Sequence, residues 1–466
     1  MLTTDIDAEG FATLTIDMPG RSMNVIDWAF NAAFGQAIAA LLANDAVKGI
    51  VVASGKSSFV AGADLAIMED FTAPGMTPAA ASRRIGEIGA VMRAMETGGK
   101  PVVAAASGTA LGGGLELMLA AHYRIAADNP KARFGLPEVT LGLLPGAGGT
   151  QRLPRLVGIA KALPLLVEGR ALTVQDAAAL GIIDEIVAPD ALLDAAKAAL
   201  REGRVSGTAR WDRKGFALPG DQPGSAAMMD LFSMTNAKTL ASTCGNYPAP
   251  KAILSCVFEG ARLPVDKGLK VERDYFGTLV TGDVAHRMIR TLFFARQKAA
   301  KAGRVPGDAA RETVRRIADA YVDEGLALVG DGVDARVVDS VARAAGMAKG
   351  PLELAAERGL RMPAATTLKA VSTDDIRERL LMAQALDAAR QFHDDEADAD
   401  LLDLDAILGC GFPAWLGGPL GYVDAMGPAQ FCARSAELAG RFGDRFLPPP
   451  GLAELAAAGR RFHQIA

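Results

Sequence analysis

The sequence predicts an α/β domain followed by an all-helical remainder. Over residues 11–116, short apolar stretches typical of strands alternate with longer stretches whose apolar residues recur at helical spacing. After residue 190 the pattern is alanine-rich and helical, interrupted by segments with glycine, proline and charge such as 204–223. Because the 466 residues exceed one typical domain, we expect two to four units.

The α/β part is predicted element by element. Residues 11–18 alternate as a strand does, and Pro19-Gly20 then turns the chain. Asp27 is a candidate N-cap for the helix that follows. The further predicted elements are a helix over 28–42, a strand over 47–53, a helix over 79–95 and a strand over 101–106. This order suits a dinucleotide-binding fold, another open α/β sheet or a spiral of strands and helices, and periodicity alone does not choose among them.

The composition argues against several classes of protein. A net charge of −5 gives no reason to expect a nucleic acid partner. The N-terminus has no basic start followed by an apolar core, and no apolar run approaches the ~20 residues that span a bilayer. The four cysteines show neither metal-binding nor disulfide spacing. We therefore expect a cytoplasmic protein without a membrane span, a disulfide framework or a metal site.

Two carboxylates stand in surroundings that charged groups normally avoid. Glu116 follows Gly112-Gly113-Gly114 inside an apolar run, and Glu138 lies in a proline-stiffened turn before the glycine-rich stretch 141–149. Burial there raises the pKa of a carboxyl group. On the residue pattern alone, an amphipathic helix with one outward glutamate explains Glu116 equally well. The glycine triplet favours a ligand site, since glycines let a ligand approach the backbone, where free N–H groups bind an oxyanion.

Three motifs, in order along the chain, carry a resemblance to a known family. They are Phe59-Val-Ala-Gly-Ala-Asp-Leu65, Ser107-Gly-Thr-Ala-Leu-Gly-Gly-Gly-Leu-Glu116, and Gly135-Leu-Pro-Glu138 with the stretch 141–153. The chain thereby resembles the enoyl-CoA hydratase branch of the crotonase superfamily. The resemblance implies a ββα spiral, in which two loops at successive turns direct backbone N–H groups at one thioester oxygen.

The resemblance also implies a site and a reaction. Ala63 and Gly113 would donate their N–H groups to the thioester oxygen of a 2-enoyl-CoA. Glu116 as base and Glu138 as acid would hold one water and add it syn to the double bond, giving a 3-hydroxyacyl-CoA in fatty acid β-oxidation. No cofactor is required, because the CoA thioester is the substrate. The residues expected at the substrate and its CoA are Lys56, Ala61, Ala63, Asp64, Leu65 and Gly113.

Other functions stay open at this point. Within the superfamily, retention of both carboxylates favours hydration, with isomerisation between 3-enoyl-CoA and 2-enoyl-CoA as a side activity. One alternative is isomerisation or other acyl-CoA chemistry as the main reaction. Another is a non-catalytic subunit of a β-oxidation complex. We expect a homo-oligomer, with a thiolase as a candidate partner.

The rest of the chain resembles the multifunctional β-oxidation proteins, which join a hydratase to a 3-hydroxyacyl-CoA dehydrogenase. The resemblance implies a helical linker and a duplicated helical domain like the C-terminal domain of that dehydrogenase, the copies marked by 338–352 and 404–420. No glycine-rich strand-to-helix turn of the NAD-binding type follows Lys301, so we expect neither NAD binding nor dehydrogenase activity. The expected domains are the crotonase domain at 1–190, the linker at 191–301, and the two helical copies at 302–366 and 367–466.

Overall fold

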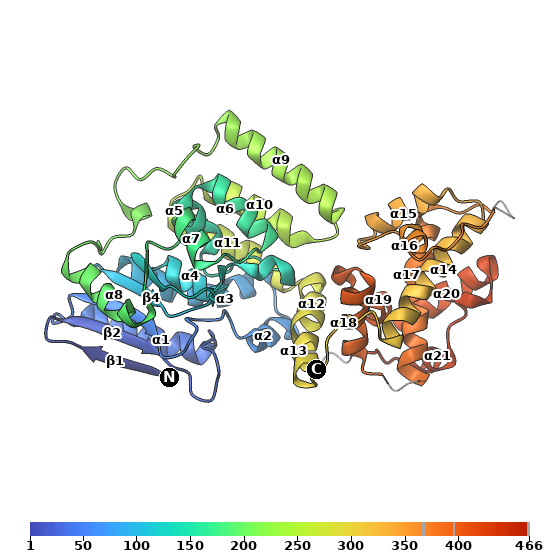
Figure 1. The fold of residues 1–466 in the computed structure, drawn as a ribbon, viewed down its shortest axis with the longest axis horizontal. Coiled ribbons are helices and arrows are strands. Elements are labelled where there is room, and N and C mark those ends of the chain that lie inside the picture. Colours follow the sequence, from blue (N-terminus) through green and yellow to red (C-terminus); the bar gives the residue numbers. More distant parts are fainter. Residues whose placement is uncertain (365–368, 395–396, 464–466) are drawn as a thin grey trace. The chain divides into compact units, whose positions relative to one another are not determined.

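The computed structural model describes residues 1–364, 369–394 and 397–463, apart from the side chains of Leu65, Thr72 and Asp394. These residues form two compact units (Figure 1). Unit 1 comprises Met1–Lys238 and Pro248–Gly282, and unit 2 comprises Thr239–Tyr247 and the chain from Asp283 onward. The two units do not coincide with the predicted domain boundaries at 190, 301 and 366.

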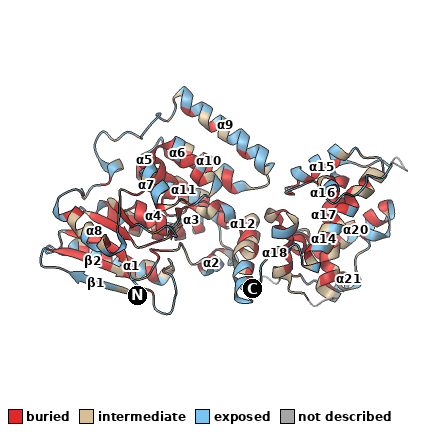
Figure 2. Cartoon of the chain, viewed as in Figure 1, coloured by how far each residue is buried: buried red, intermediate tan, exposed pale blue. Residues whose placement is uncertain are grey.

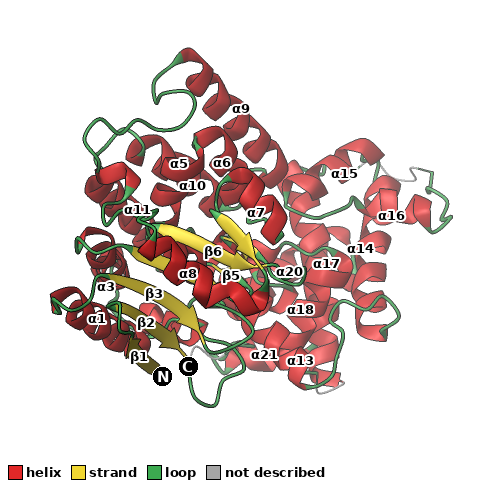
Figure 3. Ribbon diagram, turned by 60° about the vertical axis from the view of Figure 1, so that its left-hand side comes forward, coloured by secondary structure: helices red, strands yellow, loops and turns green. Residues whose placement is uncertain are grey.

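A six-stranded sheet is the main sheet of unit 1 (Figure 3). Its order is β1-β2-β3-β4-β6-β8, in which β1 is antiparallel to β2 and all other neighbours are parallel. Every residue of β4 is buried, as its run of valine and alanine predicts for a strand covered on both faces. The strands are β1 (Leu2–Ile6), β2 (Phe11–Ile16), β3 (Gly49–Ser54), β4 (Val102–Ala106), β6 (Tyr123–Ala127) and β8 (Glu185–Val187). The predicted strands at 11–18, 47–53 and 101–106 are confirmed, whereas β1 was not predicted.

The helices predicted over 28–42 and 79–95 are present in unit 1 as α1 and α3. Asp27 caps α1, its carboxylate accepting the amide of Phe30 at 2.7 Å, as predicted. Helix α8 covers one face of the sheet, and its Leu200 shares a core with Val51 and Val103. The helices are α1 (Trp28–Ala43), α2 (Met68–Thr72), α3 (Pro78–Thr97), α4 (Gly113–Leu119), α5 (Gly149–Val157), α6 (Ile159–Glu168), α7 (Val174–Leu180), α8 (Leu192–Arg201), α10 (Pro248–Gly260) and α11 (Val265–Val280); α9 (Ala226–Thr243) runs from unit 1 into residues of unit 2.

Helices α10 and α11 belong to unit 1, although the sequence assigned them to a linker. Helix α11 packs along α3 and α10 packs on α5 and α6. The approach of α11 to α3 is close, because a Cβ added at Gly277 would lie 2.3 Å from the carbonyl oxygen of Pro78. The segment 248–282 therefore completes the first unit.

Unit 2 is helical, and its described residues form a large apolar core and a smaller cluster of Ala295, Ala299 and Leu404. Tyr321, Leu380 and Phe431 are buried in the same cluster, so the predicted copies 302–366 and 367–466 share a core. That the two segments are copies stays a prediction. The helices that begin within unit 2 are α12 (Asp283–Ile289), α13 (Arg296–Lys301), α14 (Glu312–Gly330), α15 (Ala335–Ala344), α16 (Pro351–Glu357), α17 (Thr373–Asp394), α18 (Ala399–Cys410), α19 (Pro419–Met426), α20 (Pro428–Phe442) and α21 (Pro450–Ala457), with a π-helical stretch at Arg290–Ala295.

None of the helices in the described part of the chain is long and apolar enough to cross a membrane. The four cysteines are unpaired.

Candidate active site

Two loops of unit 1 meet beside the N-terminus of α4. The first leaves β3 and contains Ala63; the second follows the short strand β5 (Ala110–Leu111), which pairs with β7 (Phe134–Gly135). The amide of Leu111 donates to the carbonyl oxygen of Val60 at 3.2 Å. A Cβ added at Gly114 would lie 2.0 Å from the same oxygen, so the close contact of the loops requires glycine there.

The glycines before α4 bring the predicted oxyanion donors and both carboxylates together. A Cβ added at Gly113 would lie 3.8 Å from the amide nitrogen of Ala63 and 3.9 Å from Oε2 of Glu116. A Cβ added at Gly112 would lie 2.9 Å from Oε1 of Glu138. In the part of the chain that the structure describes, the amides of Ala63 and Gly113 donate no backbone hydrogen bond. Both are therefore available to an oxyanion.

Glu116 lies on α4, whose residues from Gly114 onward are buried (Figure 2). Its Oε1 accepts the amides of Ala147 and Gly149, each at 2.8 Å. Burial raises the pKa of Glu116, while those two amides and the charge of Arg152 act in the opposite direction and favour the ionised form. The outward-facing alternative for Glu116 is excluded, since the side chain is only 3% exposed.

Glu138 lies on the 3-10 turn η2 (Pro137–Leu141), directly after the proline that begins the turn. Its Oε2 is buried and has no hydrogen-bond partner among the described residues. Burial raises the pKa of Glu138 well above its usual value, and the charges of Glu116 and Glu272 raise it further. A raised pKa favours the protonated form that a general acid needs, whereas Glu116 has the donors that an anionic base needs.

Three charged residues around this pair were missed by the sequence analysis. Arg152 on α5 is fully buried, pairs with both oxygens of Glu96 at 2.8 Å and donates to the carbonyl oxygen of Ala147 at 2.6 Å. Glu272 on α11 accepts the amide and the hydroxyl of Thr150. Arg152 lies within the quoted stretch 141–153, which was a usable signal. Glu96 and Glu272 lie in amphipathic helices, where the pattern predicts an exposed carboxylate.

The predicted CoA-binding side chains are engaged with protein groups. The ammonium of Lys56 pairs with Asp17 at 2.9 Å, and Asp64 pairs with Arg21 at 2.6 Å. The amide of Ala61 donates to the carbonyl oxygen of Asn24, a fully buried residue that the sequence did not single out. The side chain of Leu65 lies outside the described residues. The roles of all these residues stay predictions.

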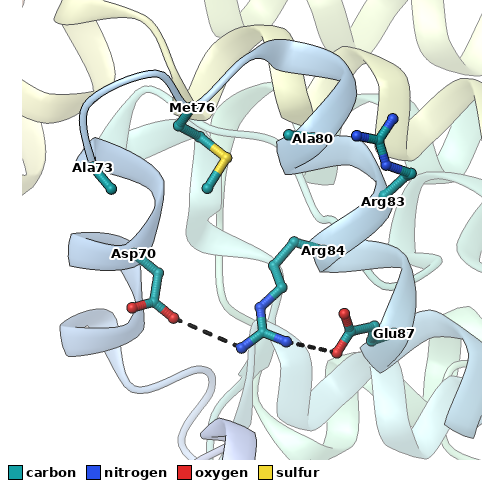
Figure 4. Close-up of a pocket in the computed structure, with 7 residues that line it drawn as sticks. All are labelled: Asp70, Ala73, Met76, Ala80, Arg83, Arg84 and Glu87. Atoms are coloured by element: carbon teal, nitrogen blue, oxygen red, sulfur yellow. Dashed lines mark hydrogen bonds and ion pairs between the residues drawn. The ribbon is translucent and has the colours of Figure 1, made fainter.

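A separate surface pocket lies between α2 and α3 (Figure 4). Its cavity volume is about 440 Å³, and Arg84 pairs there with Asp70 and Glu87. None of the predicted site residues lines it. The lining residues are Asp70, Ala73, Met76, Ala80, Arg83, Arg84 and Glu87. Among the residues placed by the structure, no cluster of three or more His, Cys, Asp or Glu side chains is arranged to hold a metal ion.

Comparison with known proteins gives two family matches. Residues 7–206 match the family described as enoyl-CoA hydratase/isomerase, and residues 313–390 match the C-terminal domain of 3-hydroxyacyl-CoA dehydrogenase. The fatty acid oxidation complex subunit alpha of Shewanella loihica is 38% identical over 312 residues, which are 66% of this chain and 43% of that protein. Its counterpart in Shewanella amazonensis is 39% identical over 328 residues, 70% of this chain and 44% of that protein. The chain thus spans less than half the length of these relatives.

Solved structures of enoyl-CoA hydratases also resemble this chain. One, from Bacillus anthracis, is 25% identical, with 66% of this chain and 97% of that chain covered and a TM-score of 0.37. Because this TM-score is low, the family assignment rests on the sequence matches alone.

Proposed function

Because residues 7–206 of this chain form a crotonase-fold domain of the enoyl-CoA hydratase/isomerase family, we propose that the protein adds water to 2-enoyl-CoA. The product is a 3-hydroxyacyl-CoA, and the reaction is a step of fatty acid β-oxidation. The observation that carries the proposal is that the two carboxyl groups differ in their partners: Oε1 of Glu116 accepts two amides, and the buried Oε2 of Glu138 has no partner among the described residues. The family resemblance and the fold class, a crotonase domain followed by a helix-rich part with a dehydrogenase C-terminal domain, are confirmed.

The proposed mechanism uses two backbone amides and two carboxyl groups. The thioester oxygen accepts the amides of Ala63 and Gly113, which stabilise the negative charge that develops on it as an enolate forms. Glu116 takes a proton from the water molecule, and the oxygen of that water bonds to C3 of the substrate. Glu138 delivers its proton to C2, so that one water has been added across the double bond and both carboxyl groups have exchanged their protonation states. Both protons move on the face of the substrate that the carboxyl groups share, which gives syn addition.

We propose that this reaction requires no cofactor, since the two carboxyl groups supply both proton transfers and the CoA thioester is the substrate. NAD binding and dehydrogenase activity are not expected, because no glycine-rich strand-to-helix turn follows Lys301. We further propose a homo-oligomer, a thiolase as candidate partner, and a reducing compartment, the cytoplasm. The four unpaired cysteines support the last point.

A second reaction, isomerisation of 3-enoyl-CoA to 2-enoyl-CoA, is favoured by the same pair. It needs one group to remove a proton from C2 and another to return a proton to C4, and a base beside an acid meets that need. The ratio of hydration to isomerisation therefore separates the two proposals.

The test is hydration of crotonyl-CoA and of a longer 2-enoyl-CoA by the purified protein. Glu116→Gln and Glu138→Gln are each expected to lower kcat by about 10²- to 10⁴-fold, the usual contribution of a general acid or base. The exposed Glu202, which pairs with Arg204, supplies the control Glu202→Gln, for which the rate of the unmodified chain is expected. NAD added to a second cuvette is expected to give no NADH. A chain that hydrates neither substrate but isomerises 3-enoyl-CoA would overturn hydration in favour of the second reaction.

A further inference from the structure

Helix α11 brings a third carboxyl group to the candidate site. Glu272 is 1% exposed, and its Oε2 accepts the amide of Thr150 at 2.8 Å and the hydroxyl of Thr150 at 2.5 Å. The preceding residue, Gly149, donates its amide to Glu116. Two consecutive amides at the N-terminus of α5 therefore hold two different buried carboxyl groups. The positive end of the helix dipole favours negative charge at this position.

The turn that binds Glu116 is held from both sides. On one side Arg152, itself paired with Glu96, donates to the carbonyl oxygen of Ala147. On the other side Glu272 holds Thr150. Because Gly149 and Thr150 are the first two residues of α5, a displacement of Thr150 shifts the turn from which Gly149 donates its amide to Glu116.

We propose that Glu272 is a positioning residue for hydration: through Thr150 it fixes the turn that binds Glu116, and it adds a third buried carboxyl group beside the catalytic pair. This inference rests on the proposed function. Neither Glu272 nor any other residue of α10 or α11 is part of the predicted site. The inference therefore gives the segment 248–282 a role in the reaction as well as in the fold.

The electrostatics of Glu272 indicate the pH range in which its charge acts. Burial, and then the charge of Glu116, raise the pKa of Glu272 to about 8, while the two hydrogen bonds from Thr150 and the charge of Arg152 act against the rise. When Glu272 ionises, its negative charge raises the pKa of Glu138. The charged and titratable groups that act on this cluster are Glu96 from α3, Glu116 from α4, Glu138 from η2, Arg152 and Arg155 from α5, and Cys256 from α10.

The first test is the pH profile of Glu272→Gln. Glutamine has the same shape and can still accept the amide of Thr150, but it carries no charge at any pH. Without that charge Glu138 loses its proton at lower pH, so the alkaline limb of kcat is expected to move down by about one pH unit. We expect kcat to fall about tenfold at pH ~9, where Glu272 of the unmodified chain is mostly ionised, and to change less than about twofold at pH ~6, with KM changing less than about twofold at both pH values. A purely structural role would lower kcat equally at every pH, and such a profile would overturn the proposal.

The control for this variant is Glu259→Gln. Glu259 lies on the neighbouring helix α10, is exposed, and accepts the hydroxyl of Tyr275 at 2.7 Å. Its replacement removes one carboxylate from the same pair of helices without touching α5. We expect both kcat and the alkaline limb to stay where they are in the unmodified chain.

A second pair of variants tests the path through Thr150. Thr150→Val keeps the shape of the side chain and the backbone amide but removes the hydroxyl that donates to Glu272. Thr150→Ser keeps the hydroxyl. We expect kcat of the valine variant to fall about tenfold and that of the serine variant to stay within about twofold of the unmodified chain. Equal rates for the two variants would overturn the role of this hydrogen bond.

An infrared titration of protonated carboxyl groups separates failure of this inference from failure of the proposed function. In Glu272→Gln, the carboxyl signal that titrates near pH 8 in the unmodified chain is expected to be absent. The signal of Glu138 is expected to titrate at a lower pH than in the unmodified chain. If the unmodified chain hydrates nothing while this change is seen, the proposed function fails and the coupling of the carboxyl groups stands. If the chain hydrates enoyl-CoA while neither the titration nor the alkaline limb moves, the role of Glu272 fails and the function stands.

Discussion

Glu116 and Glu138 lie close in space but differ in their hydrogen-bond partners. Two amides from the turn before α5 bind Glu116, and the buried Oε2 of Glu138 has no partner among the described residues. The first environment stabilises an anion and the second a neutral acid. The assignment of base and acid that the family resemblance implies agrees with these environments, and it stays a prediction until the glutamine variants are measured.

Gly112 supplies a test at the scale of one residue. Its φ of 53° and ψ of −129° form a combination that only glycine adopts readily, and a Cβ there would lie 2.9 Å from Oε1 of Glu138. Gly112→Ala is therefore expected to displace the N-terminus of α4 or the carboxyl group of Glu138. We expect kcat for crotonyl-CoA to fall by about 10²-fold, as for a misplacement of about 1 Å.

The matched control for that variant is Gly181→Ala. Gly181 also has a positive φ, 84°, but an added Cβ has no neighbour within 4 Å. It should lower the melting temperature through backbone strain of about 1 kcal/mol and leave kcat unchanged. Equal losses of kcat in the two variants would show that strain, rather than the contact with Glu138, explains the effect at Gly112.

At the scale of elements, short pieces of backbone place the site. The two-residue strands β5 and β7 pair with each other, and the bridge between Val60 and Ala110 joins the first loop to the second. No periodic pattern predicts a strand of two residues. The glycines at 112–114 nevertheless identified the position, since their function there is local: a positive φ and close backbone contacts.

Helix α17 in unit 2 provides a test of pH-dependent stability. Ser372 and Asp375 form a capping box at its start, in which the serine hydroxyl accepts the amide of Asp375 and the carboxylate of Asp375 accepts the amide of Ser372, each at 3.1 Å. Arg441 also donates to this carboxylate at 2.7 and 2.8 Å. Arg441, together with the bonds from Ser372, holds the pKa of Asp375 below its usual value.

The stability that Asp375 contributes follows from the sign of this shift. A depressed pKa means that the contribution is full above pH ~4, the pKa of the unfolded chain, and is lost as the pH falls through the folded pKa. Asp375→Asn is expected to cost about 1–2 kcal/mol at pH ~7 and clearly less at pH ~3, measured by urea unfolding of unit 2. The neighbouring Asp374 is exposed and pairs with Arg377, so Asp374→Asn should cost less than about 0.5 kcal/mol at both pH values. An equal cost of Asp375→Asn at the two pH values would contradict the capping argument.

At the scale of the whole molecule, the first unit ends at residue 282 rather than at the predicted 190. Hydrogen bonds, in addition to apolar packing, hold the segment 248–282 to the rest of the first unit. The buried guanidinium of Arg155 on α5 donates to the carbonyl oxygens of Gly260 and Leu263, each at 2.8 Å, and Thr150 bonds Glu272. Removing α10 and α11 would break these hydrogen bonds from α5 to the segment 248–282.

Truncation tests this division. A chain ending at residue 282 is expected to fold cooperatively and to hydrate crotonyl-CoA at a rate near that of the full chain. A chain ending at residue 247 lacks the carbonyl oxygens of Gly260 and Leu263 to which Arg155 donates, and it exposes the faces of α3, α5 and α6 that α10 and α11 cover. We expect it to aggregate or to keep less than about a tenth of the activity. Size-exclusion chromatography, thermal melting and the hydration assay compare the two. Full activity in the shorter chain would show that the first unit does not need α10 and α11, and it would also remove the proposed role of Glu272.

Features that depend on residues close together in the chain could be predicted before the structure was known. The strands β2, β3 and β4, the cap of α1, the glycine turn before α4 and the positions of Glu116 and Glu138 follow from apolar periodicity and from the few residue types that a turn accepts. The family resemblance rests on those same local motifs, and it is confirmed.

Which amphipathic helices bury their charged residues depends on packing between distant segments, and the sequence pattern does not specify it. Glu96 and Glu272 look like exposed carboxylates in sequence, yet both are 1% exposed because helices from distant parts of the chain pack around them. The buried Arg152 pairs with Glu96, and Thr150 bonds Glu272, so each charge is acceptable only in the folded arrangement. The sequence pattern shows which side chains are polar, but it does not show which of them are buried. The carboxyl groups of Glu96 and Glu272 are held by partners that lie 56 and 122 positions away in the chain.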